Sequence, residues 1–163
     1  MTKIKKIAII GTVAAAIGAV VAAFFTIKHR RAKAKRDKVR DRLSNLSEYY
    51  EKSEINPEMS EEITVKPWND SFMITVRKED AHGTGTTKVT YLTPEEEELF
   101  LNVVEDAVSY GISSSDMPDI IKGSKEWGYV TFKDGSKKYF SKDTGEGLFL
   151  RDRAWFYDLS VAR

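Results

Sequence analysis

The longest stretch without a charged side chain is the feature that most constrains this sequence. Residues 7–27 read IAIIGTVAAAIGAVVAAFFTI, and Lys6 and Lys28 close the run at its two ends. As a helix that rises about 1.5 Å per residue, this run would be roughly 31 Å long, which matches the hydrocarbon thickness of a bilayer. The sequence therefore predicts a transmembrane helix over residues 7–27, preceded by a short tail of residues 1–6.

Two other interpretations compete with a membrane span. Lys3, Lys5 and Lys6 have the pattern of the basic start of a signal peptide, and residues 14–16 are three alanines that offer a cleavage site. An uncleaved anchor is favoured, because the run is longer than the apolar core of a signal peptide and cleavage would leave a strongly apolar new terminus. A buried helix of a soluble domain is the third interpretation, and runs of this length seldom belong to a globular core.

The basic residues that flank the run predict its orientation. Three lysines precede it, whereas nine Lys and Arg side chains follow it, from Lys28 to Arg42. Since cationic flanks stay in the cytoplasm, we expect a single-pass protein of the cell membrane whose soluble domain is cytoplasmic.

Small residues recur every fourth position along the predicted span. They are Gly11, Ala15, Ala19 and Ala23. Such a row lets two helices approach closely, so self-association through the transmembrane helix is one expectation. Chance is the other explanation, because alanine and glycine are frequent throughout the run.

The segment 28–58 is predicted to be a basic juxtamembrane helical stalk with a linker, because no Gly or Pro occurs in it before Pro57. Its first cations are expected to contact lipid head groups, as polybasic segments do beside anionic leaflets. These candidate lipid contacts are Lys28, Arg30, Arg31, Lys33, Lys35 and Arg36. The alternative interpretation is that these cations serve simply as topology determinants. A nucleic-acid partner is not expected, because no aromatic residues alternate with them.

Apolar residues within this stalk fall on one helical stripe. Val39, Leu43, Leu46 and Tyr50 are spaced by four, three and four residues. The stripe is too short to indicate a coiled coil, so it predicts either packing on the folded domain or a seam between two copies.

Residues 59–163 are predicted to form a soluble α+β domain, a small antiparallel sheet packed against one main helix. Thr93-Pro94-Glu95-Glu96 is typical of a helix start, and the apolar spacing continues to Tyr110 before Gly111. Asp134-Gly135 joins two β-like runs and predicts a hairpin. The expected strands are 63–66, 71–77, 86–92, 127–133, 136–141 and 148–150. A helical turn is expected within 115–122, and a strand or short helix over 154–159.

Charge is divided unevenly along the chain, although its formal net charge is only +1. Residues 1–43 carry 12 basic and 2 acidic side chains, whereas residues 44–163 carry 14 basic and 23 acidic ones. This asymmetry indicates a membrane or polyanion contact at the basic end. The chain has no cysteine, which excludes disulfides, thiolate metal sites and a cysteine nucleophile.

No arrangement of residues predicts catalysis, a metal site or a cofactor. His82 stands alone in a Gly-rich loop, which lacks the Lys-Ser/Thr ending of a phosphate-binding loop. Glu95–Glu98 spread around the first turn of a helix, where negative charge is favoured anyway. We therefore expect a protein that is not an enzyme.

Aromatic residues crowd the last 37 positions of the sequence. Alternation along strands can bury only about half of them on one side of a sheet. The others would form an aromatic surface for a protein partner, or would be covered by a second layer. The candidate partner-binding residues are Trp127, Tyr129, Tyr139, Trp155 and Tyr157.

Three functional hypotheses follow, of which the least favoured is a hydrolase or transferase that uses Asp, Glu and Ser residues without a local motif. The first is a membrane-anchored, non-enzymatic protein whose acidic α+β domain is a protein-interaction module. The second is an exported or extracellular-facing anchored domain that binds an external ligand or a cell-wall component.

Overall fold

A computed structural model describes residues 25–145 and 148–162 of the chain. The chain divides into two compact units, residues 1–38 and 39–163. Within the described residues, no helix is both long and apolar enough to cross a membrane. The predicted span lies outside the described residues except for positions 25–27, so it stays a prediction.

The predicted helical stalk is confirmed only in its first part. Residues 25–38 are helical and exposed, and the second unit starts with helical residues 39–43. The prediction of helix beyond this point is wrong, because Leu46–Asn56 is a β-strand, β1. Val39 and Leu43 belong to the hydrophobic core of the domain. Leu46 of the same stripe also lies in this core, but as the first residue of β1, so the stripe is helical only over its first two members.

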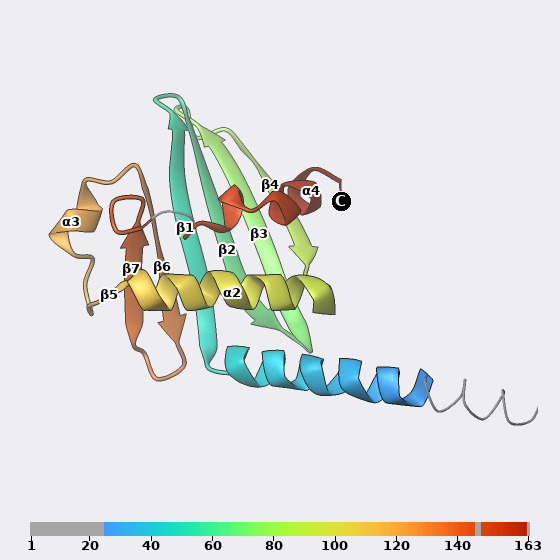
Figure 1. The fold of residues 1–163 in the computed structure, drawn as a ribbon. Coiled ribbons are helices and arrows are strands. Elements are labelled where there is room, and N and C mark those ends of the chain that lie inside the picture. Colours follow the sequence, from blue (N-terminus) through green and yellow to red (C-terminus); the bar gives the residue numbers. More distant parts are fainter. Residues whose placement is uncertain (1–24, 146–147, 163) are drawn as a thin grey trace, which may run out of the picture. The chain divides into compact units, whose positions relative to one another are not determined.

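The second unit is an α+β domain, as predicted (Figure 1). Its seven strands form one antiparallel sheet with the order β4-β3-β2-β1-β6-β7-β5. The strands are β1 Leu46–Asn56, β2 Met59–Trp68, β3 Ser71–Asp80, β4 Gly85–Tyr91, β5 Ile112–Ser113, β6 Glu126–Phe132 and β7 Lys137–Ser141. The helices are α2 Pro94–Tyr110, α3 Asp119–Lys122, α4 Ala154–Ala162 and the 3-10 turn η1 Leu150–Asp152.

Helix α2 crosses the strands on one side of the sheet (Figure 1), and it begins where the sequence predicts. The Thr93 side chain accepts a hydrogen bond from the Glu96 backbone N–H, and the Glu96 carboxylate accepts one from the Thr93 N–H, which completes a capping box. Phe100, Val103 and Ala107 lie on its buried face. The main helix of the α+β prediction is thus confirmed.

The Asp134-Gly135 hairpin is also confirmed. Gly135 has φ of 84°, and Asp134 accepts hydrogen bonds from the backbone N–H and the hydroxyl of Ser136. The segment 148–150 differs from the prediction, because it leads into the 3-10 turn η1 and is not a strand. The final segment is the helix α4.

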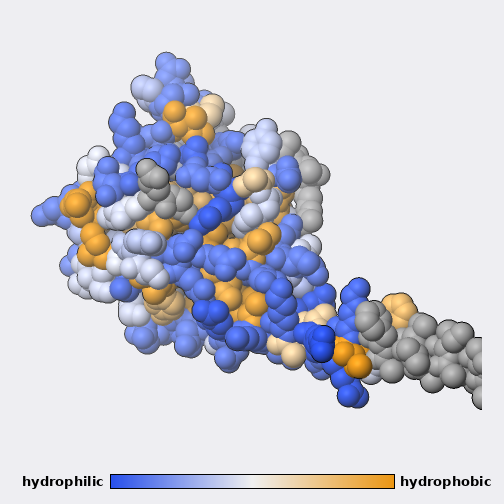
Figure 2. Space-filling view, viewed as in Figure 1, coloured by the Kyte–Doolittle hydropathy of each residue, from blue (hydrophilic) through white to orange (hydrophobic). Residues whose placement is uncertain are grey.

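The core lies between the sheet and the helices α2 and α4. Tyr49 of β1 stacks on Phe140 of β7, with ring centroids 5.7 Å apart, and meets the edge of Phe100 from α2 at 5.6 Å. Phe156 and Leu159 of α4 belong to the same core. Seen from this helix-bearing side, the surface is mainly hydrophilic, with hydrophobic residues in small separate groups (Figure 2).

Candidate functional site

Side chains on the other side of the sheet form a row of aromatic rings. We call this side, opposite α2 and α4, the open face. Strand register places Tyr50 of β1 opposite Tyr129 of β6, and Tyr129 opposite Tyr139 of β7. Trp127 lies two residues before Tyr129 on β6, opposite Lys52. Tyr50, Trp127, Tyr129 and Tyr139 are hereafter the aromatic row.

Each ring of the aromatic row is in contact with a neighbouring ring. Tyr50 stacks on Tyr129 with centroids 5.0 Å apart, and its ring also lies 5.5 Å from that of Trp127. Tyr139 meets the edge of Tyr129 at 5.9 Å. Aromatic pairs at these distances stabilise each other beyond the area they bury. Tyr50, Trp127 and Tyr129 therefore form a continuous, partly exposed surface, and Tyr139 packs beneath its edge as a buried ring.

Charged side chains surround this row. The Tyr129 hydroxyl donates a hydrogen bond to Glu48, and the Lys66 ammonium lies 2.6 Å from the same carboxylate. Lys137 places its ammonium 4.1 Å from the centre of the Tyr129 ring, within cation–π range. A second ion pair, Lys52 with Glu62, spans 3.2 Å beside Trp127. The aromatic row thus has a polar rim.

These contacts determine protonation states on the open face. Partial burial alone would raise the pKa of Glu48, but hydrogen bonds from Lys66 and Tyr129 outweigh it and hold the pKa below its ordinary value. Burial and the nearby carboxylates raise the pKa of both Tyr50 and Tyr129 above the usual range. At neutral pH the face thus presents neutral rings and an ionised Glu48, which suits binding by stacking and hydrogen bonding.

The structure brings together three of the five predicted partner-binding residues. Trp127 and Tyr129 are partly exposed on the open face, whereas Tyr139 is buried, with 5% of its surface exposed. Trp155 and Tyr157 lie on α4, on the other side of the sheet. Trp155 packs against the hydrophobic core, and Tyr157 is exposed.

Tyr50 belongs to the row but is missing from the predicted set. Its spacing from Leu46 assigns it to the helical stripe of the stalk, whereas the structure places it in β1, paired with Thr64 of β2 and Tyr129 of β6. The adjacent pair Tyr49-Tyr50 is the feature of the sequence that could have predicted a strand here, since aromatic residues favour strands.

The two membrane-related sets of residues lie in different parts of the chain. Lys28, Arg30, Arg31, Lys33, Lys35 and Arg36 lie on the exposed helical residues 25–38. Gly11, Ala15, Ala19 and Ala23 lie outside the described residues. Lipid contact and helix association therefore both stay predictions.

A buried carboxylate, Glu51, lies on the helix-bearing side of β1. One oxygen accepts hydrogen bonds from the Tyr49 hydroxyl at 2.6 Å and the Leu150 backbone N–H at 2.8 Å, and the other accepts from the Arg151 N–H at 3.0 Å. Burial raises the pKa of Glu51 to about 7, against the lowering effect of these donors. The carboxylate binds the start of η1 to the central strand, which is a structural role.

The remaining titratable groups do not gather into a metal site in the described residues. There, no group of three or more His, Asp or Glu side chains is placed to hold a metal ion. His82 is exposed in the β3–β4 loop, where its backbone N–H donates to Asp80. Comparisons with protein-family models, curated proteins and solved structures found no match to this chain.

Proposed function

We propose that this chain is a single-pass membrane protein, not an enzyme, whose α+β domain binds a protein partner through the open face. The observation that carries the proposal is the aromatic row, which lies on the side of the sheet away from the core. Tyrosine and tryptophan supply much of the binding energy at protein interfaces, because they bury a large area at little cost in conformational entropy.

The membrane part of the proposal is supported by the sequence. Residues 7–27 are uncharged, and nine cations follow the run. The domain carries an excess of acidic side chains, so an anionic membrane surface would attract the basic segment and repel the domain. The open face would then remain accessible to a partner in the cytoplasm.

The absence of cysteine allows a direct test of this topology. We expect that a single cysteine placed at exposed Ser115 reacts with a membrane-impermeant maleimide only after the cells are permeabilised. A matched variant, Thr2→Cys, is expected to react in intact cells. Reaction at position 115 in intact cells would instead favour the exported domain, and release of a shortened soluble chain would show that residues 7–27 are a signal peptide.

The aromatic row predicts which substitutions abolish partner binding. We expect the double variant Tyr50→Ala, Trp127→Ala to recover at least about tenfold less partner than wild type when the full-length chain is extracted in mild detergent, since a single interface hot spot is worth about 2 kcal/mol. The measurement is quantitative mass spectrometry of the co-purified proteins. Tyr110→Ala is the matched control, because Tyr110 is an exposed tyrosine at the end of α2. Equal loss in both variants would contradict the proposal.

A further inference from the structure

Strand β4 forms one edge of the sheet in the described part of the chain. At its end, the Leu92 N–H donates a hydrogen bond to the Phe72 carbonyl of β3. In an antiparallel pair, residues whose backbone groups bond to the partner strand alternate with residues whose backbone groups point the other way. Counted from Leu92, the N–H and C=O groups of Thr87, Val89 and Tyr91 therefore point away from β3. The edge thus presents a regular set of backbone donors and acceptors.

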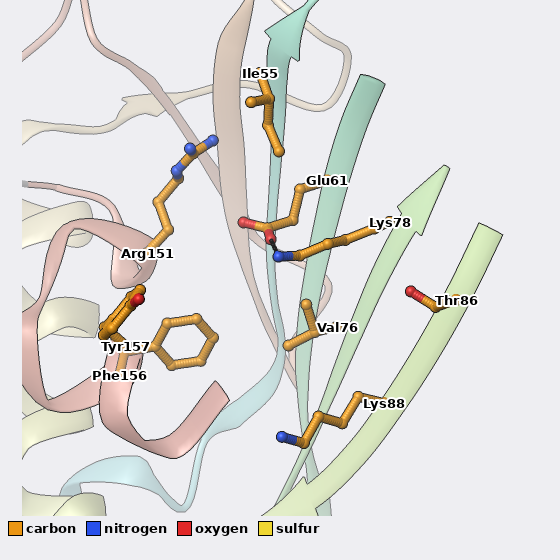
Figure 3. Close-up of a pocket in the computed structure, with 9 residues that line it drawn as sticks. All are labelled: Ile55, Glu61, Val76, Lys78, Thr86, Lys88, Arg151, Phe156 and Tyr157. Carbon is orange, nitrogen blue, oxygen red and sulfur yellow. Dashed lines mark ion pairs between the residues drawn. The ribbon is translucent and has the colours of Figure 1, made fainter. Parts of the chain in front are cut away.

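This edge lacks most of the features that keep other strands from pairing with an exposed edge, which are prolines, bulges and charged side chains. Strand β4 contains no proline, and it pairs with β3 in unbroken register over its whole length. Its one charged residue is Lys88, whose side chain points toward α4 (Figure 3). The open-face side of this strand therefore carries no charge.

Apolar side chains are exposed on both sides of the edge. Strand register places Val89 in line with Tyr50 across β2 and β3, so Val89 and Tyr91 are on the open face, and about half of each side chain is exposed. On the other side, exposed Tyr157 of α4 lines a groove of about 390 Å³ together with Lys88. A strand added to β4 would remove part of this apolar surface from water.

We propose that β4 pairs with β4 of a second copy of this chain, antiparallel, with Val89 on the two-fold axis. Val89 then lies opposite Val89, and Thr87 lies opposite Tyr91. All three residues whose backbone groups point outward exchange N–H to C=O hydrogen bonds with their counterparts. The side-chain pairs on the open face are β-branched with β-branched and aromatic with β-branched, which are favourable across strands.

The sequence of β4 selects this register over its two neighbours. A shift of two residues is the smallest that keeps the outward-pointing groups opposed. In one direction it places Lys88 directly opposite Lys88, and like charges in that position destabilise a strand pair. In the other direction it leaves Thr87 without a counterpart in β4, which ends at Tyr91. With Val89 on the axis, Lys88 lies opposite the neutral Thr90.

This self-complementarity identifies a second copy as the occupant of the edge. The two sheets become one continuous sheet, and the two open faces lie on the same side of it, because residues paired across strands share a side. The pairing does not depend on the proposed function of the aromatic row. A partner that binds the open face would meet two aromatic rows on one surface.

The absence of cysteine makes the register directly testable in the full-length chain in its own membrane. In the proposed pair, the two Val89 Cα atoms are about 5.5 Å apart, which a disulfide can bridge. The two Lys88 residues are diagonal neighbours about 7 to 8 Å apart, beyond easy bridging. With copper phenanthroline as oxidant, Val89→Cys is expected to give at least about fivefold more disulfide-linked dimer than Lys88→Cys.

Two results of the cross-linking would overturn the proposal. Lys88→Cys that cross-links as well as Val89→Cys would contradict the register. Val89→Cys that cross-links no more than Ser115→Cys would exclude the pairing, because Ser115 is exposed outside β4 and reports random collisions.

A second measurement is the mass of the full-length chain in mild detergent by light scattering. Val89→Pro removes an N–H that points away from β3, so it is expected to weaken the dimer at least about tenfold, whereas Val89→Ala keeps that N–H and is expected to weaken it less than about threefold. A dimer that survives Val89→Pro would place the interface elsewhere, such as in residues 7–27, and would contradict the proposal. Circular dichroism of each variant verifies that it folds.

Discussion

Replacing Glu51 with alanine is expected to lower the free energy of unfolding by about 3 kcal/mol at pH 8. The substitution leaves the Leu150 N–H, the Arg151 N–H and the Tyr49 hydroxyl without their carboxylate acceptor. Each buried donor that loses its acceptor costs about 1 to 3 kcal/mol, and removing a buried charge offsets part of the sum. Urea denaturation measures the loss, and amide exchange at Leu150 and Arg151 shows whether η1 detaches first.

The pH dependence of this loss follows from the pKa of Glu51, which rises from 4.5 to about 7 on folding. Between these values the folded state holds a proton that the unfolded state has released. Glu51 therefore contributes its full stabilisation of the folded state below pH 4.5. This contribution is lost as the pH rises from 4.5 through 7. Glu51→Ala is expected to cost about 2 to 3 kcal/mol more at pH 5 than at pH 8.

Glu54→Ala is the matched control, because Glu54 is an exposed carboxylate on the same strand. We expect it to change the free energy of unfolding by less than about 0.5 kcal/mol. A loss below about 1 kcal/mol for Glu51→Ala, or a loss that grows from pH 5 to pH 8, would contradict the structural role assigned to this carboxylate.

Gly128→Ala is expected to lower the free energy of unfolding by about 3 kcal/mol, the upper end of the usual cost of overpacking. A Cβ atom at Gly128 would lie within 3.0 Å of the Tyr50 carbonyl oxygen and of the Phe140 ring. Relief of this overlap has to move β1 away from β6, and these strands carry Tyr50 and Tyr129. Thermal unfolding measures the stability, and tyrosine ring signals in NMR spectra report the displacement of the aromatic row.

Gly123→Ala provides the control for this glycine. Gly123 follows α3 with φ of −90°, and a Cβ atom there would meet nothing within 4 Å. We expect a change within about 0.5 kcal/mol. If Gly128→Ala changed the stability as little as Gly123→Ala, this result would contradict the close contact between Gly128 of β6 and the Phe140 ring.

The elements that the sequence predicts well carry their signals locally. Helix α2 has its capping residues and apolar spacing within one segment, and the Asp134-Gly135 turn needs only its two residues and the strands beside it. The β3–β4 hairpin is similar, because Asp80 accepts hydrogen bonds from the His82 and Thr84 backbone N–H groups and Gly83 has φ of 78°.

Strand β1 is not predicted because polar residues occupy two of its buried positions. Glu51 and Ser53 face the helix-bearing side, so the alternation of apolar and polar residues that reveals a strand is absent after Tyr49. Good helix formers and a chance spacing of apolar residues predict a helix there instead. Tyr50 is consequently absent from the predicted surface, although it contacts both Trp127 and Tyr129.

The C-terminal segment illustrates a second reason for error. Leu148, Phe149 and Leu150 have the composition of a strand, yet all three are buried in the core and lead into η1. Their conformation depends on Glu51, about 100 positions earlier in the chain, which binds the Leu150 and Arg151 N–H groups. A long-range contact of this kind leaves no local pattern in the sequence.

Photocross-linking in intact cells tests most directly whether the open face binds a protein partner. Benzoylphenylalanine in place of Trp127 is expected to give one discrete adduct on illumination, and Tyr50→Ala in the same chain is expected to reduce its yield at least about tenfold. The same probe at exposed Tyr110 is the control and is expected to give no such adduct. An adduct of equal yield from Tyr110, or no adduct from position 127, would contradict the proposed function of the aromatic row.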